Sequence, residues 1–204
     1  MRQVLWLLLL ATLPALASKT CVDCHAGAAE RSYALSKHGI IARIEEGRTR
    51  QRAPDCVACH AFEATAPAPK HYANEKLRAT AREHATSGCG SCHSPRYVTE
   101  QQAAAQRALA IGEMKQREAE AVVETARKEL MGEDLARIEK LLTTLRDKDL
   151  QHLRLGLAHQ SPDYQWWLGQ AALDGSLLRI KGVLGEARRS QVAQTMPVKA
   201  SANK

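Results

Sequence analysis

Three pentapeptides determine how this chain is organised: Cys21-Val22-Asp23-Cys24-His25, Cys56-Val57-Ala58-Cys59-His60 and Cys89-Gly90-Ser91-Cys92-His93. They use all six cysteines of the 204-residue sequence, always as a pair separated by two residues and followed directly by histidine. Disulfide frameworks of exported proteins and four-cysteine zinc sites also contain such pairs. Neither alternative explains the three histidines. The repeated pattern is the attachment signature of a c-type haem.

Each pentapeptide has the residue types that covalent haem attachment requires. Two thiols add to the two vinyl groups of the haem as thioethers, and two intervening residues let one turn of chain reach both. The histidine that follows is then held beneath the iron as its proximal ligand. The sequence therefore predicts three haems, with thioethers at Cys21, Cys24, Cys56, Cys59, Cys89 and Cys92 and proximal ligands at His25, His60 and His93.

The composition of residues 18–98 favours the same conclusion. This segment contains only twelve large apolar side chains, which are too few for a normal hydrophobic core. Three flat, apolar macrocycles would fill that interior, with the many small alanines packed against them. The formal charge of the whole chain is +7, and six haem propionates would offset most of it, so we expect no nucleic-acid partner.

Five further histidines are available as second axial ligands of the irons. His38, His71 and His84 lie inside the haem region, between the attachment sites, and form the preferred distal set. His152 and His159 lie far along the chain, and the sequence leaves open whether either is a ligand. Distal ligands in closely packed multihaem chains often come from the segment of another haem, so the sequence does not assign a histidine to a particular iron.

The N-terminal residues predict export. A short positive segment at 1–3 precedes an apolar run at 4–13, and Ala15 and Ala17 are the small residues that a signal peptidase reads. An uncleaved anchor is the alternative, but a bilayer span needs about 20 apolar residues. We therefore expect residues 1–17 to be a cleaved signal peptide, and the mature chain to be periplasmic with no membrane span.

From Thr99 onward, glycine and proline become rarer and the composition is typical of long helices. Three helices are predicted, at about 100–131, 133–158 and 161–189, and residues 191–204 are expected to form a flexible tail. In the third helix, Ser161 is expected to cap the N-terminus and Pro162 to occupy the first turn. The predicted apolar positions are Leu109, Val122, Val123, Ala126 and Leu130 in the first helix, Leu135, Ile138, Leu142 and Leu145 in the second, and Tyr164, Leu168, Ala171 and Leu178 in the third.

The expected fold is mostly α. A haem-packed N-terminal module with little regular structure, at 18–98, is followed by a long three-helix bundle at 99–190. The predicted helices are far longer than the globular average of about 11–12 residues. They would either only cap the haems or also join subunits.

Three motifs besides the pentapeptides resemble the C-terminal half of hydroxylamine oxidoreductase and related octahaem cytochromes. They are Y-A-L-S-K-H-G at 33–39, C-G-S-C-H-S-P-R at 89–96 and H-Q-S-P-D-Y-Q-W-W-L-G at 159–169. The resemblance covers residues 21 to about 181. It implies bis-histidine electron-transfer haems packed edge to edge, and long helices that support a trimer.

The chain also departs from that family. The catalytic haem of the octahaem enzymes belongs to an N-terminal half with no counterpart here, so we do not expect this polypeptide alone to oxidise hydroxylamine. A tyrosine of a neighbouring subunit is crosslinked to that haem in the family, and Tyr164 is the residue that resembles it. The last family motif often ends W-H-G, but Leu168 occupies the place of the histidine.

The function expected from the sequence is electron transfer between redox protein partners by a trihaem cytochrome c. An alternative is an enzyme, or the small subunit of a catalytic multihaem enzyme, in which one open haem acts on a nitrogen or sulfur compound. A third interpretation treats the long helices as a docking module that holds the haems beside a redox partner.

Overall fold

The structure is a computed structural model that describes residues 21–49, 52–60, 83 and 86–195. Every regular element in this part of the chain is a helix, which confirms the predicted mostly α class. The proposed signal peptide, His71 and His84 lie outside the described residues. No helix among the described residues combines the length and the apolarity that a membrane span needs.

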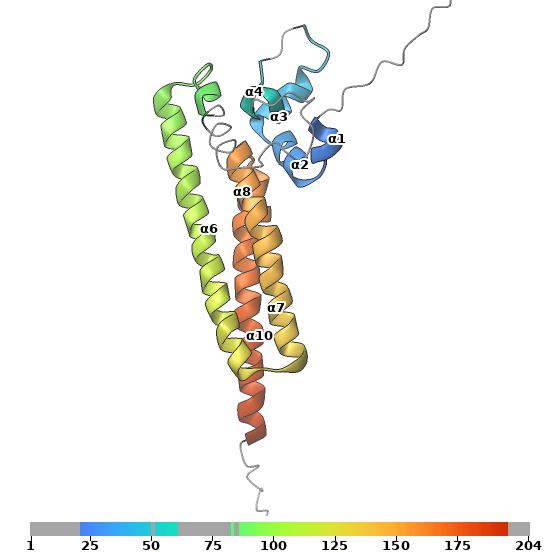
Figure 1. Cartoon of the computed structure of the whole chain (residues 1–204), viewed down its shortest axis with the longest axis vertical. Coiled ribbons are helices and arrows are strands. Elements are labelled where there is room, and N and C mark those ends of the chain that lie inside the picture. The colour runs from blue at the N-terminus through green and yellow to red at the C-terminus, as the bar shows by residue number, and fades with distance from the viewer. Residues whose placement is uncertain (1–20, 50–51, 61–82, 84–85, 196–204) are drawn as a thin grey trace, which may run out of the picture.

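Short helices form the described part of the N-terminal module, which lies at one end of the bundle (Figure 1). Their bounds are α1 Cys21–His25, α2 Ala28–Ala34, α3 Lys37–Ile44 and α4 Cys56–His60. The module is therefore more helical in these stretches than the sequence predicted. The first two attachment pentapeptides are themselves the helices α1 and α4.

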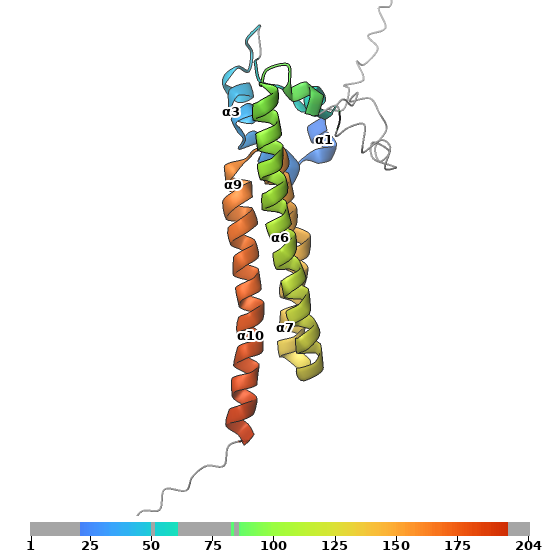
Figure 2. The same ribbon diagram turned by 90° about the vertical axis from the view of Figure 1, so that its left-hand side faces the viewer.

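Three long helical rods run alongside one another and alternate in direction (Figures 1 and 2). The first is α6, Pro95–Glu129. The second joins α7 Gly132–Thr144, the π-helical turn η1 Leu145–Asp149 and α8 Leu150–His159. The third joins α9 Pro162–Gln165, the π-helical turn η2 Trp166–Gln170 and α10 Ala171–Thr195. The second rod thus returns the chain to the end of the bundle beside the N-terminal module, which is called the haem end below because it carries the attachment pentapeptides.

The rod boundaries correct three details of the sequence prediction. The first rod starts about five residues early, because Ser94 accepts a hydrogen bond from the Tyr97 amide (3.4 Å) and Pro95 follows it. The third rod extends to Thr195, into the segment expected to be a tail. Ser161 stands at the N-cap position of the third rod, but its hydroxyl makes no capping hydrogen bond, and its carbonyl accepts the first hydrogen bond of the helix from the Gln165 amide at 2.9 Å.

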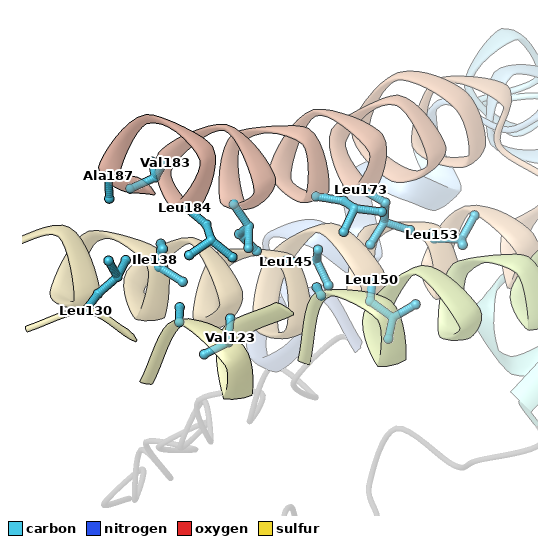
Figure 3. Packing of buried hydrophobic residues seen from close by; sticks show 14 of the residues in the cluster. Val123, Leu130, Ile138, Leu145, Leu150, Leu153, Leu173, Val183, Leu184 and Ala187 are labelled. Atoms are coloured by element: carbon cyan, nitrogen blue, oxygen red, sulfur yellow. The ribbon is translucent and has the colours of Figure 1, made fainter. Parts of the chain in front are cut away.

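One apolar core runs between the three rods (Figure 3). Ile138, Leu145, Leu153 and Leu173 are fully buried in it. The predicted positions Val123, Ala126 and Leu130 are buried as well, and Leu109, Val122, Leu135 and Leu142 pack against the core from its margin. The predicted stripes of the first two rods are therefore confirmed.

The apolar positions predicted for the third rod are wrong after Tyr164, which is the one of the four that is buried. Leu168 and Leu178 are 40% and 67% exposed, and Ala171 is also exposed. The turn η2 is π-helical, so one extra residue enters the turn and the buried face moves on by one position. Tyr164 is followed at the buried face by Gly169, five residues later, and then by Leu173 and Leu177.

Replacement of Ile138 tests the bundle core separately from the haem end. We expect Ile138→Ala to lower the free energy of unfolding by about 2–5 kcal/mol, because it opens a cavity among packed side chains. Leu178→Ala is the matched control, since Leu178 is 67% exposed and its loss should change stability by no more than about 0.5 kcal/mol. Denaturant unfolding of both variants measures the difference, and equal effects would contradict this core.

Candidate haem sites

Each attachment pentapeptide forms a helical turn. Helices α1 and α4 span the first two, and in the third the His93 amide donates to the Cys89 carbonyl at 2.9 Å. Residues three apart in a helix lie on the same face, so Cys56 and Cys59 lie on one face of α4. This is the local geometry that two vinyl groups on one edge of a haem require.

Hydrogen bonds at the start of α4 fix the second pentapeptide. The Asp55 carboxylate accepts from the Ala58 amide at 2.8 Å and so caps the helix. One residue earlier, the Pro54 carbonyl accepts from the Tyr33 hydroxyl at 2.7 Å. The buried Glu45 carboxylate accepts from the Arg52 amide at 2.8 Å. The segment that leads into α4 is therefore hydrogen-bonded to α2 through Pro54 and to the end of α3 through Arg52.

The three pentapeptides lie together although they are far apart in the sequence. Burial raises the pKa of the Cys56 thiol, and the nearby Cys21 adds to the effect. Burial likewise raises the pKa of Cys59, and the nearby Cys89 adds to it. The second pentapeptide therefore lies near the first on the side of Cys56 and near the third on the side of Cys59.

Two pairs of histidine rings lie close together at this end of the molecule. The ring centroids of His38 and His93 are 6.0 Å apart with planes at 44°, and those of His60 and His159 are 6.4 Å apart with planes at 76°. Two imidazoles on opposite sides of one metal ion have centroids about 6 Å apart, because each metal–nitrogen bond is about 2.0 Å and each nitrogen lies about 1.1 Å from its ring centroid. Each pair thus has the separation of two axial ligands of one iron.

The pairs favour haem over zinc. No group of three or more histidine, cysteine or acidic side chains in the described part of the chain could hold a metal ion by itself. A structural zinc site takes all four ligands from the protein. Two opposed imidazoles instead suit an iron whose other four ligands are the nitrogens of a macrocycle. The donor set therefore fits the haems that the pentapeptides predict.

His159 is a candidate site residue outside the preferred distal set. It is the last residue of α8, and its Nδ1 atom is buried and has no hydrogen-bond partner within the described structure. A buried nitrogen without a partner costs free energy, so such an atom points to a ligand that it binds. The sequence does contain a signal for this position. The second predicted helix is long enough to return to the end of the bundle beside the N-terminal module, and His159 lies at its C-terminus.

Close contact between backbones holds His159 in place. Gly156 lies in α8 where a β-carbon would be only 2.5 Å from the Gln165 amide nitrogen, so glycine lets α8 and α9 touch. Gln160 then takes the left-handed conformation, with φ at 55°, and reverses the chain. The Ser161 amide donates to the Gly156 carbonyl at 2.9 Å. This tight connection fixes the end of α8.

Desolvation lowers the pKa of three of the paired histidines. It lowers the pKa of His38, and the neighbouring His93 adds to the effect. It also lowers the pKa of His60, beside His25, and that of His159, beside His60. A lower pKa keeps the imidazole neutral near pH 7, and the neutral ring is the form that binds a metal ion.

His152 and Tyr164 pack against each other. Their rings meet edge to face, with centroids 5.2 Å apart. Tyr164 is only 2% exposed, and its hydroxyl accepts from Arg31 Nε at 3.4 Å. The resemblance would have Tyr164 reach a neighbouring subunit, but its side chain lies in the interior of its own chain.

No model of a known protein family matches this chain, and no curated protein matches it. Of the predicted site residues, the structure describes His25, His38, His60 and His93 and every cysteine side chain except that of Cys24. It brings together His38 and His93 as one pair and the first two pentapeptides as neighbours.

Proposed function

We propose that this protein is a periplasmic trihaem cytochrome c that carries electrons between redox partners. The observation that supports the proposal most is the pairing of histidines at the separation of axial ligands, beside cysteines of the attachment pentapeptides. Two attachment histidines, His60 and His93, each face a histidine from elsewhere in the chain.

The pairs suggest which histidines serve which haem. His93 and His38 would hold the iron of the third haem, and His60 and His159 that of the second. His25 is the proximal ligand proposed for the first haem. His71 and His84, both in the preferred distal set, remain the candidates for its second ligand, because His152 is engaged with Tyr164.

Each haem, when bound, supplies a one-electron couple at its iron. The residues of this chain set the conditions for that couple. Two imidazoles at each iron would leave no place for a substrate and would keep the same ligands in both oxidation states. The partly buried surroundings of His38 and His159 would limit access of water. This arrangement favours electron transfer over catalysis.

The positions of the cysteines suggest an order for the relay. Cys21 of the first pentapeptide is near enough to influence Cys56 of the second, and Cys89 of the third is near enough to influence Cys59. Because each thioether lies at the edge of its haem, the second haem would have its two attachment edges next to two different neighbours. We therefore propose that electrons pass between the first and third haems by way of the second.

The partners proposed are redox proteins, among them a catalytic multihaem subunit. Near the haem end of the bundle, Trp166 and Trp167 are 64% and 73% exposed. Large exposed aromatic side chains are typical of protein contact surfaces. Assembly into a trimer through the long helices stays a prediction from the resemblance.

Mass and ligand binding of the purified protein test this function. We expect the intact mass to equal the chain from Ser18 plus three haems, with no free thiol and no disulfide. The reduced protein should bind almost no carbon monoxide, because every iron has two histidine ligands. Two haems or bound zinc would overturn the proposal, and one carbon monoxide per chain would favour the enzyme with an open haem.

A further inference from the structure

Tyr33 contacts both sides of the proposed second haem site. Its hydroxyl donates to the Pro54 carbonyl at 2.7 Å, two residues before Cys56 begins the attachment helix α4. Its ring meets the ring of His159 edge to face, with centroids 6.2 Å apart and planes at 80°. One side chain therefore lies against the segment that carries His60 and against His159 itself.

The backbone of Tyr33 is fixed by its neighbours in α2. The fully buried Ser32 donates through its hydroxyl to the Leu155 carbonyl of α8 at 3.0 Å. On the other side of α2, Gly39 packs so closely that a β-carbon there would lie 2.1 Å from the Tyr33 carbonyl oxygen. Helix α2 is thus held against α8 and α3 at once, and Tyr33 has little freedom to move.

We propose that Tyr33 is a positioning residue that sets the separation and the relative orientation of His60 and His159. This inference rests on the proposed function, since it concerns the two ligands of the second haem. The hydroxyl fixes α4 through Pro54, and the ring edge limits rotation of the His159 imidazole. Groups that orient axial ligands tune the metal they hold, although they do not touch it.

The two contacts of Tyr33 come from different parts of its side chain. The hydroxyl donates to the Pro54 carbonyl, and the ring meets His159. A phenylalanine at this position would keep the ring contact and lose only the hydrogen bond, so the two contributions can be separated.

The test compares Tyr33→Phe and Tyr33→Leu in the full-length haem-loaded protein. Electron paramagnetic resonance and a redox titration resolve the three low-spin haems. Tyr33→Phe should shift the g-values and the potential of one haem, because α4 is released while the ring remains. Tyr33→Leu should shift the same haem further and make part of it high-spin, since both contacts are lost.

Tyr97→Phe is the matched control. Tyr97 stacks on His93, with centroids 4.7 Å apart, so any effect should fall on the third haem and leave the signal that responds to Tyr33 unchanged. If both Tyr33 variants retain three haems with unaltered signals and potentials, the inference is overturned, even if thermal stability falls. If His159→Ala leaves the parent spectrum unchanged, the proposed ligand pair fails instead.

Discussion

Replacing His159 by alanine is expected to convert one haem of the three from six-coordinate low-spin to open high-spin. The reduced variant should then bind one carbon monoxide per chain, where the parent binds almost none. The reason is that the imidazole of His159 faces His60 at the separation of two axial ligands, and its buried Nδ1 atom has no other partner in the described structure. Carbon monoxide titration of the reduced protein measures the change.

Two further histidine variants sharpen this result. His152→Ala is the control, because the His152 ring packs against Tyr164, and all three haems should stay low-spin. His38→Ala should open a different haem, since His38 faces His93, and the double variant with His159→Ala should bind two carbon monoxide molecules. If His38→Ala and His159→Ala affect the same haem, the assignment of pairs is wrong.

The assignment also bears on the separation of the chain into domains. The sequence suggests that residues 18–98 form a haem module by themselves. With His159 as a ligand, the second haem is completed by the end of the helical bundle. The bundle would then have a role at the haems besides covering them, because it carries a ligand across more than 60 residues of sequence from the third pentapeptide.

Gly39→Ala is expected to disturb the third haem and the stability of the whole module. A β-carbon at Gly39 would lie 2.1 Å from the Tyr33 carbonyl oxygen and 2.8 Å from the Ala34 α-carbon. Both are backbone atoms, so α3 must move away from α2 and carry His38 away from His93. Such overpacking costs about 1–3 kcal/mol or more. We expect a high-spin share in the spectrum and a clear fall in the unfolding midpoint.

Gly182→Ala is the matched control for this change. Gly182 lies within α10, and beyond its chain neighbours and its own helix backbone no atom is within 4 Å of the position of its β-carbon. Alanine should therefore stabilise this helix by up to about 1 kcal/mol through its higher helix propensity. Denaturant unfolding and electron paramagnetic resonance of the two variants give the comparison. Gly39→Ala with the stability and spectrum of Gly182→Ala would contradict the close contact between α2 and α3.

The long helices were predictable because their signals are local. Composition and spacing in the second rod placed Leu135, Ile138, Leu142 and Leu145 on one face, and the structure buries or half-buries all four. The start of α6 was missed, although Ser94 and Pro95 carry a capping signal, because they follow directly on the third pentapeptide. The motif at 89–93 places Ser94 and Pro95 at the end of the haem module, although they also begin a helix.

The phase of the third rod was not predictable in the same way. A period of 3.6 residues predicts that Leu168 is the next buried position after Tyr164. Because the turn at 166–170 is π-helical, the next buried residue is Gly169 instead. A similar turn at 145–149 separates Leu145 from Leu150, both buried. Nothing in the local spacing marks an extra residue, because such turns depend on how neighbouring helices fit together.

The sequence by itself predicts where haems would be attached, while the tertiary structure decides which histidines could share an iron. Both thiols and the proximal histidine of each predicted haem lie within five consecutive residues, so a single helical turn holds them and no distant part of the chain is needed. His60 and His159 lie about one hundred residues apart and meet only because the second rod returns to the haem end. Spacing along a chain encodes contacts within a turn, but contacts between elements depend on packing.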